Sequence, residues 1–104
     1  MGRGKIPRPV RLAEKLIQIR AALGLSQNEL IQRLGLADVL IREDISEFER
    51  DRRIPPLTVL LEYARVAGVY IDALVDDAVD LPARIPCSPK SEGVRRRRPK
   101  SKEN

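Results

Sequence analysis

The side chains in this sequence that could do chemistry are mainly arginines and carboxylates. The 104-residue chain has 20 Lys and Arg residues, 15 Asp and Glu residues, no histidine and one cysteine, Cys87. Histidine is the commonest general base and metal ligand, so its absence argues against both tasks. The composition therefore predicts a protein that is not an enzyme and that uses no metal or cofactor. Arginines suit another task, because guanidinium groups bind phosphates and the edges of bases.

The net charge of +5 is distributed unevenly along the chain. Residues 1–11 carry +4, residues 12–83 carry −5, and residues 84–104 carry +6. Basic ends favour a polyanionic partner, whereas an acidic body opposes indiscriminate binding of nucleic acid. The length predicts one small domain. With one cysteine, no signal peptide and no long apolar run, the chain is expected to be cytoplasmic and to have no membrane partner.

Two short helices are predicted at the centre of the chain, where they would position these arginines. Ser26 and Glu29 have the spacing of a capping box, in which each side chain caps the backbone N–H of the other. A helix is therefore expected to follow Ser26 and to end at Gly35 in a left-handed conformation. Ile45 and Phe48 share one face of a second helix. Two short helices joined by a turn that contains a glycine are typical of a helix-turn-helix.

Several residues at these spacings carry a resemblance to one family. They are Ser26-Gln27, Leu30, Leu34-Gly35, Ile45-Ser46, Glu49, Arg53 and Pro55. Through them, residues 11–76 resemble the Cro/repressor-type helix-turn-helix domain, also called the xenobiotic-response-element family. The resemblance implies an all-α, five-helix domain that reads the major groove of double-stranded DNA in a bacterial transcriptional regulator. It also implies a homodimer, because members usually bind two half-sites about one helical turn apart.

The chain departs from the family pattern at two places. Asp51 stands where the family usually has glycine, and aspartate is among the few residues that tolerate a left-handed conformation. About four extra residues also lie within the segment 36–44. They leave two alternatives open. Either Asp38 caps a helix that begins at Val39, or the extra residues lengthen the turn and the helix begins near Ile41.

The resemblance implies DNA contacts at the ends of the two central helices. Gln27 lies where family members contact a phosphate, and Asn28 is expected to assist it. Arg42 and Glu43 lie where base edges are usually read; Arg can bond guanine O6 and N7, and Glu can accept from cytosine N4. The predicted DNA-binding residues are Gln27, Asn28, Arg42, Glu43, Ser46, Glu47, Arg50, Arg52 and Arg53.

Some of these residues also have simpler interpretations as parts of the folded surface. Arg42 could pair with a neighbouring acid. The resemblance implies a structural ion pair between Arg20 and Glu49, which would be costly to break from one side. Arg53 could share Glu49, and that contact would remove it from the phosphates.

The remaining segments are predicted from periodicity and composition. Residues 1–10 are expected to form a flexible basic arm, residues 11–82 the helical domain, and residues 83–104 a disordered basic tail. A first helix is predicted by the apolar positions Leu12, Leu16, Ile19 and Leu23. The prolines at 55 and 56 suit the start of a fourth helix, whose buried face is expected to contain Leu57, Leu60, Leu61, Ala64 and Ala67. A short fifth helix is expected over residues 69–75.

The leading functional prediction is a sequence-specific DNA-binding transcriptional regulator. The alternative is a protein-interaction module, such as the antitoxin of a toxin–antitoxin pair, whose acidic surface would bind a basic protein partner. In a third interpretation only the basic tail binds nucleic acid. Its run of four arginines, residues 95–98, could equally be a solvated charge run or, less in keeping with a bacterial protein, a nuclear-localisation signal.

Overall fold

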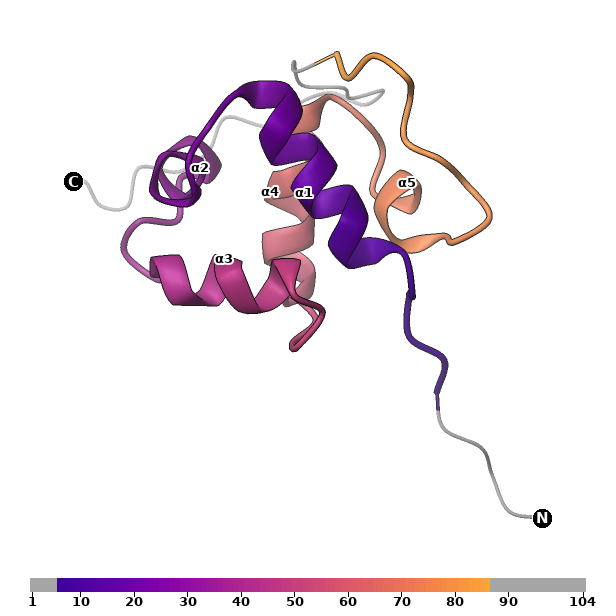
Figure 1. Cartoon of the computed structure of the whole chain (residues 1–104), viewed down its shortest axis with the longest axis horizontal. Helices are drawn as coiled ribbons and strands as arrows, with labels where there is room; N and C mark the ends of the chain where they lie inside the picture. Colours follow the sequence, from indigo (N-terminus) through magenta and orange to yellow (C-terminus); the bar gives the residue numbers. More distant parts are fainter. Residues whose placement is uncertain (1–5, 87–104) are drawn as a thin grey trace.

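A computed structural model describes residues 6–86 of the chain. This part is all-α and contains no strand. In chain order its helices are α1 (Leu12–Leu23), α2 (Gln27–Leu34), α3 (Arg42–Glu49), α4 (Leu57–Ala67) and α5 (Asp72–Val75). Helix α1 packs against α3, α4 and α5, and α2 packs against α3 and α4 (Figure 1). The prediction of a compact all-α domain with five helices is confirmed.

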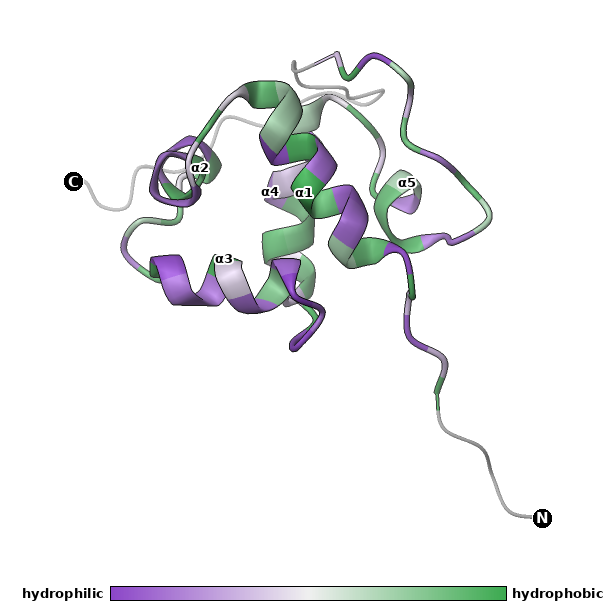
Figure 2. Cartoon of the chain, in the orientation of Figure 1, coloured by the Kyte–Doolittle hydropathy of each residue, from purple (hydrophilic) through white to green (hydrophobic). Residues whose placement is uncertain are grey.

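All five helices contribute side chains to one apolar core. Its residues in α1, α2 and α3 are Leu12, Leu16, Ile19, Leu30, Ile31, Leu34, Ile45 and Phe48. Their spacing places them on one side of each helix, as predicted for α1 and α3, because an α-helix repeats every 3.6 residues. The other side of α3 is left to polar residues, and Figure 2 shows its visible surface as mostly hydrophilic while α4 is mostly hydrophobic.

Helix α4 buries three of the five residues predicted for its core face, and its buried face is rotated relative to the prediction. Leu57 and Leu61 are exposed, with 72% and 37% of their surface accessible. Val59 and Tyr63 are buried in their place, together with the predicted Leu60, Ala64 and Ala67. The leucine spacing is misleading because Leu57 and Leu61 lie roughly 90° or more around the helix from the centre of the buried face.

The extra residues between α2 and α3 lengthen the turn. Gly35 ends α2 with a φ of 74°, as predicted for a left-handed C-terminal residue. The backbone N–H groups of Val39 and Leu40 then donate to the carbonyl oxygen of Leu36, at 3.0 and 2.9 Å. Asp38 lies inside this turn and does not cap a helix. Of the two alternatives that the sequence leaves open, the second is therefore correct.

A buried lysine joins α1 to the chain around and beyond α5. The Lys15 side chain is fully buried. Its Nζ donates to the carbonyl oxygens of Ala73, Asp76 and Val79, at 2.9, 3.0 and 2.6 Å. Carbonyl groups at the end of a helix lack partners within it, so they can satisfy an ammonium group that has lost its water.

Asp77 reinforces this connection by binding the backbone of the two residues that precede α1. Its carboxylate accepts the backbone N–H groups of Val10 and Arg11, each at 3.0 Å. These hydrogen bonds hold the pKa of Asp77 below its ordinary value. Arg11 also pairs with Asp80 at 2.6 Å. The segment after α5 is thus fastened to the first turn of α1.

The packed part of the chain continues beyond the predicted boundary at residue 82. Leu81 is buried, and Ile85 is partly buried against the core. The predicted disorder of the tail from residue 87 onward, and of residues 1–5 in the arm, concerns segments outside the described residues.

Candidate nucleic-acid interface

Helix α3 carries most of the residues that the sequence predicts to contact DNA. It begins at Arg42, and the backbone N–H of the preceding residue, Ile41, donates to the Asp44 carboxylate at 2.9 Å. An acid in the first turn also suits the positive end of the helix dipole. With Ile45 and Phe48 buried, α3 leaves five predicted residues on its outer side or just beyond it. Arg42, Glu43 and Arg50 are exposed, and Ser46 and Glu47 are half-buried.

Gln27 and Asn28 lie in the first turn of α2, which begins as predicted. Ser26 Oγ accepts the N–H of Glu29 at 3.1 Å, and the N–H of Ser26 donates to Glu29 Oε1 at 2.8 Å. The Gln27 amide nitrogen donates to Glu49 Oε1 at 3.2 Å, so this side chain is held toward α3. Asn28 is exposed. Of the two, Asn28 has the side chain that points into solvent.

The ion pair that was expected between Arg20 and Glu49 is present. Arg20 Nε lies 2.7 Å from Glu49 Oε2, and Arg20 Nη2 lies 3.0 Å from Oε1. The Glu49 side chain is only 7% exposed, and this hydrogen bond raises the pKa of Arg20. Arg20 Nη1 also donates to the carbonyl of Leu25 at 3.0 Å. With Gln27 on the same carboxylate, the pair fixes the start of α2 against the end of α3.

Arg53 is engaged by acids of α3, and not by Glu49. Its Nη2 lies 2.9 Å from Asp44 Oδ1, and its Nε lies 3.5 Å from Glu47 Oε1. The guanidinium also lies 5.0 Å from the centre of the Phe48 ring, within the range of a cation–π contact. The interpretation that Arg53 shares Glu49 is therefore wrong, because Arg20 and Gln27 already occupy that carboxylate.

The other predicted arginines are less engaged in ion pairs than Arg53. Arg50 and Arg52 are exposed and make no ion pair with any residue in the range 6–86. Arg42 lies 3.8 Å from Glu43, a loose contact in which both side chains are more than half exposed. Asp51, between Arg50 and Arg52, has a φ of 60°, the left-handed conformation that the family resemblance implies at this position.

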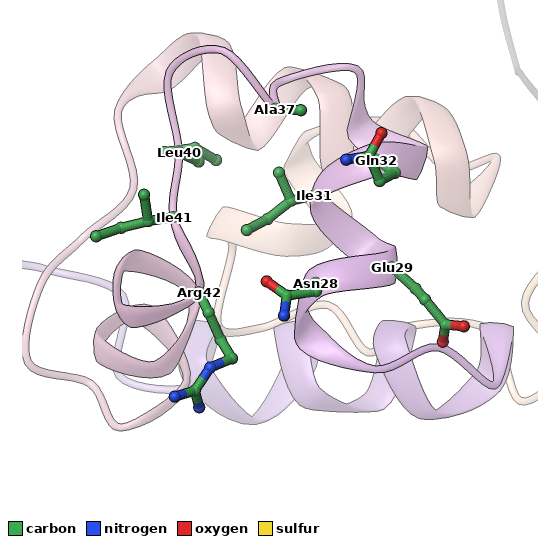
Figure 3. Close-up of a pocket in the computed structure, with 8 residues that line it drawn as sticks. All are labelled: Asn28, Glu29, Ile31, Gln32, Ala37, Leu40, Ile41 and Arg42. Carbon is green, nitrogen blue, oxygen red and sulfur yellow. The ribbon is translucent and has the colours of Figure 1, made fainter.

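An open hollow of about 350 Å³ lies between α2 and the lengthened turn. Its lining consists of Asn28, Glu29, Ile31, Gln32, Ala37, Leu40, Ile41 and Arg42. In Figure 3, Ile31, Leu40 and Ile41 surround the hollow, and Asn28 and Arg42 lie near one end of it. The first turn of α2 and the first residue of α3 therefore border one continuous surface.

The outer side of α3 and the turn after it carry both signs of charge. Arg42, Arg50 and Arg52 provide positive charge, but Glu43 and Glu47 lie among them and remain at least partly exposed. Carboxylates and phosphates are both negative and repel each other, so these acids weaken any purely electrostatic attraction of a nucleic acid. Recognition here would depend on hydrogen bonds to a few base edges more than on charge.

Two residues that shape the surface were not among the predicted site residues. Asp44 caps α3 and holds Arg53; its place three residues after Ile41 is a usable local signal. Arg8, in the predicted flexible arm, pairs with Asp51 at 2.8 Å. The partners are 43 residues apart, so no local pattern could have indicated this contact.

Comparison with protein families, with curated proteins and with solved structures found no match for this chain. Within residues 6–86, no helix has the length and hydrophobicity that crossing a membrane requires. In the same range, carboxylates and thiols form no cluster that could hold a metal ion.

Proposed function

We propose that this protein is a sequence-specific DNA-binding regulator of transcription, in which α2 and α3 act as a helix-turn-helix. The observation that carries the proposal is the shared surface of Asn28 and Arg42, which both border the hollow between α2 and the turn. An N-terminal end of α2 beside an outward-facing α3 is the arrangement in which one helix contacts the backbone while the next enters the major groove.

In this proposal the predicted residues divide by task. Arg42, Glu43, Ser46 and Glu47 would face base edges, where arginine reads guanine and glutamate reads cytosine. Gln27, Asn28, Arg50, Arg52 and Arg53 would contact the backbone. The structure adds a condition for two of them. Gln27 and Arg53 would have to exchange their present carboxylate partners for phosphates, so they are weaker candidates than Asn28, Arg50 and Arg52.

The Arg20–Glu49 pair would support this function without touching DNA. It holds the start of α2 against the end of α3, and Glu49 is too buried to reach a base. Fixing the angle between the two helices is what allows the side chains of both to reach one stretch of DNA. The family resemblance further supports binding as a homodimer in the bacterial cytoplasm.

The direct test is selection of DNA from a random pool with the purified full-length protein. We expect enrichment of one motif, with two related half-sites about 10 base pairs apart if the protein binds as a dimer. In the variant Glu43→Gln a carboxylate that only accepts hydrogen bonds is replaced by an amide that also donates them. The selected motif should therefore change at one position. A pool that shows no enrichment would overturn the proposal.

A second candidate function is binding of a basic protein partner, such as the toxin of a toxin–antitoxin pair. It is favoured by the net charge of −5 over residues 12–83 and by the exposure of the apolar side chains Ile54 and Leu57. Co-expression with the product of the adjacent reading frame tests it. Co-purification that is lost in the variant Leu57→Asp, with the fold retained, would support this function; independent elution of the two proteins would oppose it.

A further inference from the structure

The segment before α1 is attached to the turn after α3. Arg8 Nη2 lies 2.8 Å from Asp51 Oδ1 and 3.4 Å from the carbonyl oxygen of the same residue. In Figure 1 both segments lie at the lower side of the helical body. Both side chains are about half exposed, so the pair contributes little to the stability of the fold. Its consequence is positional: it holds Arg8 beside Arg50 and Arg52.

The conformation of Asp51 makes this contact specific to the turn. A φ of 60° is a conformation that glycine adopts without strain, and the resemblance described above leads one to expect glycine here. Aspartate tolerates it at some cost and adds a carboxylate that glycine lacks. That carboxylate is the group that binds Arg8.

The pairing also changes the charge that the turn presents. Without Arg8, the carboxylate of Asp51 would lie between Arg50 and Arg52 and offset part of their attraction for an anion. With Arg8 bound, the acid is neutralised and both arginines remain exposed, without an ion pair among the described residues. The anchor therefore brings Arg8 to the turn that carries Arg50 and Arg52.

We propose that Asp51 anchors the N-terminal arm so that the arm and the turn after α3 form a single cationic surface for the phosphodiester backbone of duplex DNA. This inference rests on the proposed function for the identity of the polyanion. It does not require that α3 read a sequence, because phosphate contacts are independent of base identity. The residues that carry it are Arg8, Asp51, Arg50 and Arg52.

The anchor itself is tested without DNA, by ¹⁵N relaxation of the full-length protein and of Asp51→Asn. Asparagine also tolerates a left-handed φ, so the turn should survive the change. We expect the backbone order parameter of Arg8 to fall in Asp51→Asn while those of α1 and α3 stay the same. An unchanged order parameter at Arg8 would overturn the anchor.

The binding surface is tested by a double-mutant cycle with Arg8→Gln and Asp51→Asn, using a random-sequence duplex at several salt concentrations. We expect Arg8→Gln to weaken binding several-fold in the wild-type background, because it exposes the acid and releases the arm. The log–log salt slope should fall by more than the roughly 0.9 expected for one lost phosphate contact. In the Asp51→Asn background the same change should cost less. Arg33→Gln, which removes an exposed cation from α2, is the matched control.

The results separate this inference from the proposed function. If Arg8→Gln lowers the affinity for duplex equally in the wild-type and Asp51→Asn backgrounds, Arg8 acts as an independent cation. That result would overturn the inference, even if a specific site is selected. A smaller loss of affinity in the Asp51→Asn background than in wild type, measured on random duplex, would support the inference. It would do so even if selection yields no motif and the proposed function fails. No measurable affinity for duplex at low salt would overturn both.

Discussion

The Nζ atom of Lys15 lies 2.6 Å from the carbonyl oxygen of Val79, so a buried ammonium in α1 holds the chain that follows α5. Two more carbonyls, of Ala73 and Asp76, complete its coordination. Together with the hydrogen bonds from Val10 and Arg11 to Asp77, this contact joins the start of the first helix to the chain after the last one.

Lys15→Met should destabilise the domain strongly. Methionine keeps most of the apolar volume of the side chain but leaves three carbonyl oxygens without the ammonium. Hydrogen bonds to charged groups contribute roughly 1.5–3 kcal/mol, and buried groups left unpaired add to the cost, so we expect a loss of about 3 kcal/mol in the free energy of unfolding. Urea unfolding measures it. Gln18→Met, at an exposed position of the same helix, is the control and should change little.

Tyr63→Phe should not destabilise the domain, although Tyr63 is fully buried. Among the described residues, its hydroxyl is the one buried side-chain group without a hydrogen-bond partner. Removing such a group avoids its desolvation penalty, so we expect the free energy of unfolding to rise by about 1 kcal/mol at pH 7. A loss of stability in denaturant unfolding would show that the hydroxyl has a partner, such as a buried water.

The same variant should also change the response to alkaline pH. Burial raises the pKa of Tyr63 far above the ordinary tyrosine value of about 10. The stability of the wild-type fold therefore does not change with the ionisation of this group below pH 10. It falls as the pH rises above 10, because the tyrosine of the unfolded chain ionises before the buried one does. The difference in stability between Tyr63→Phe and wild type should be constant up to pH 10 and should increase beyond it.

Asp77→Asn should lower stability at neutral pH but not in acid. The pKa of Asp77 is lowered chiefly by the hydrogen bonds from the backbone of Val10 and Arg11. A lowered pKa stabilises the fold above the unfolded value of about 3.9, and this contribution is lost as the pH falls through the folded value. Thermal melts should show a difference from wild type at pH 7 that shrinks below pH 4. Asp38→Asn, exposed in the lengthened turn, should show no such pattern.

Arg42→Ala and Arg50→Ala should weaken DNA binding in different ways. If Arg42 contacts guanine with both nitrogens, its loss should cost about 1–3 kcal/mol at one base pair and relax the preference there. Arg50→Ala should weaken binding about equally for all sequences and flatten the salt dependence. A binding profile over every single-base change in a selected site measures both. A profile of Arg42→Ala that matches wild type at every position would exclude direct readout by Arg42.

The sequence by itself determined the features that depend on neighbouring residues. The capping box at Ser26 and Glu29, the left-handed end at Gly35, and the buried faces of α1 and α3 follow from neighbouring residues and their spacing. Such patterns are reliable because the geometry that produces them is local. They sufficed for an all-α domain of five helices and for the residues on the outer side of α3. The left-handed conformation at Asp51 was implied by the family resemblance.

Only the tertiary structure decided which side chains pair across the domain. Arg53 binds Asp44 because Arg20 and Gln27 occupy Glu49, and this competition depends on three helices meeting at one carboxylate. Lys15 and Arg8 find partners 58 to 64 and 43 residues away, where sequence spacing carries no information about distance in space. The buried face of α4 was likewise fixed by its neighbours, because leucines were available on more than one side of the helix and packing selected among them.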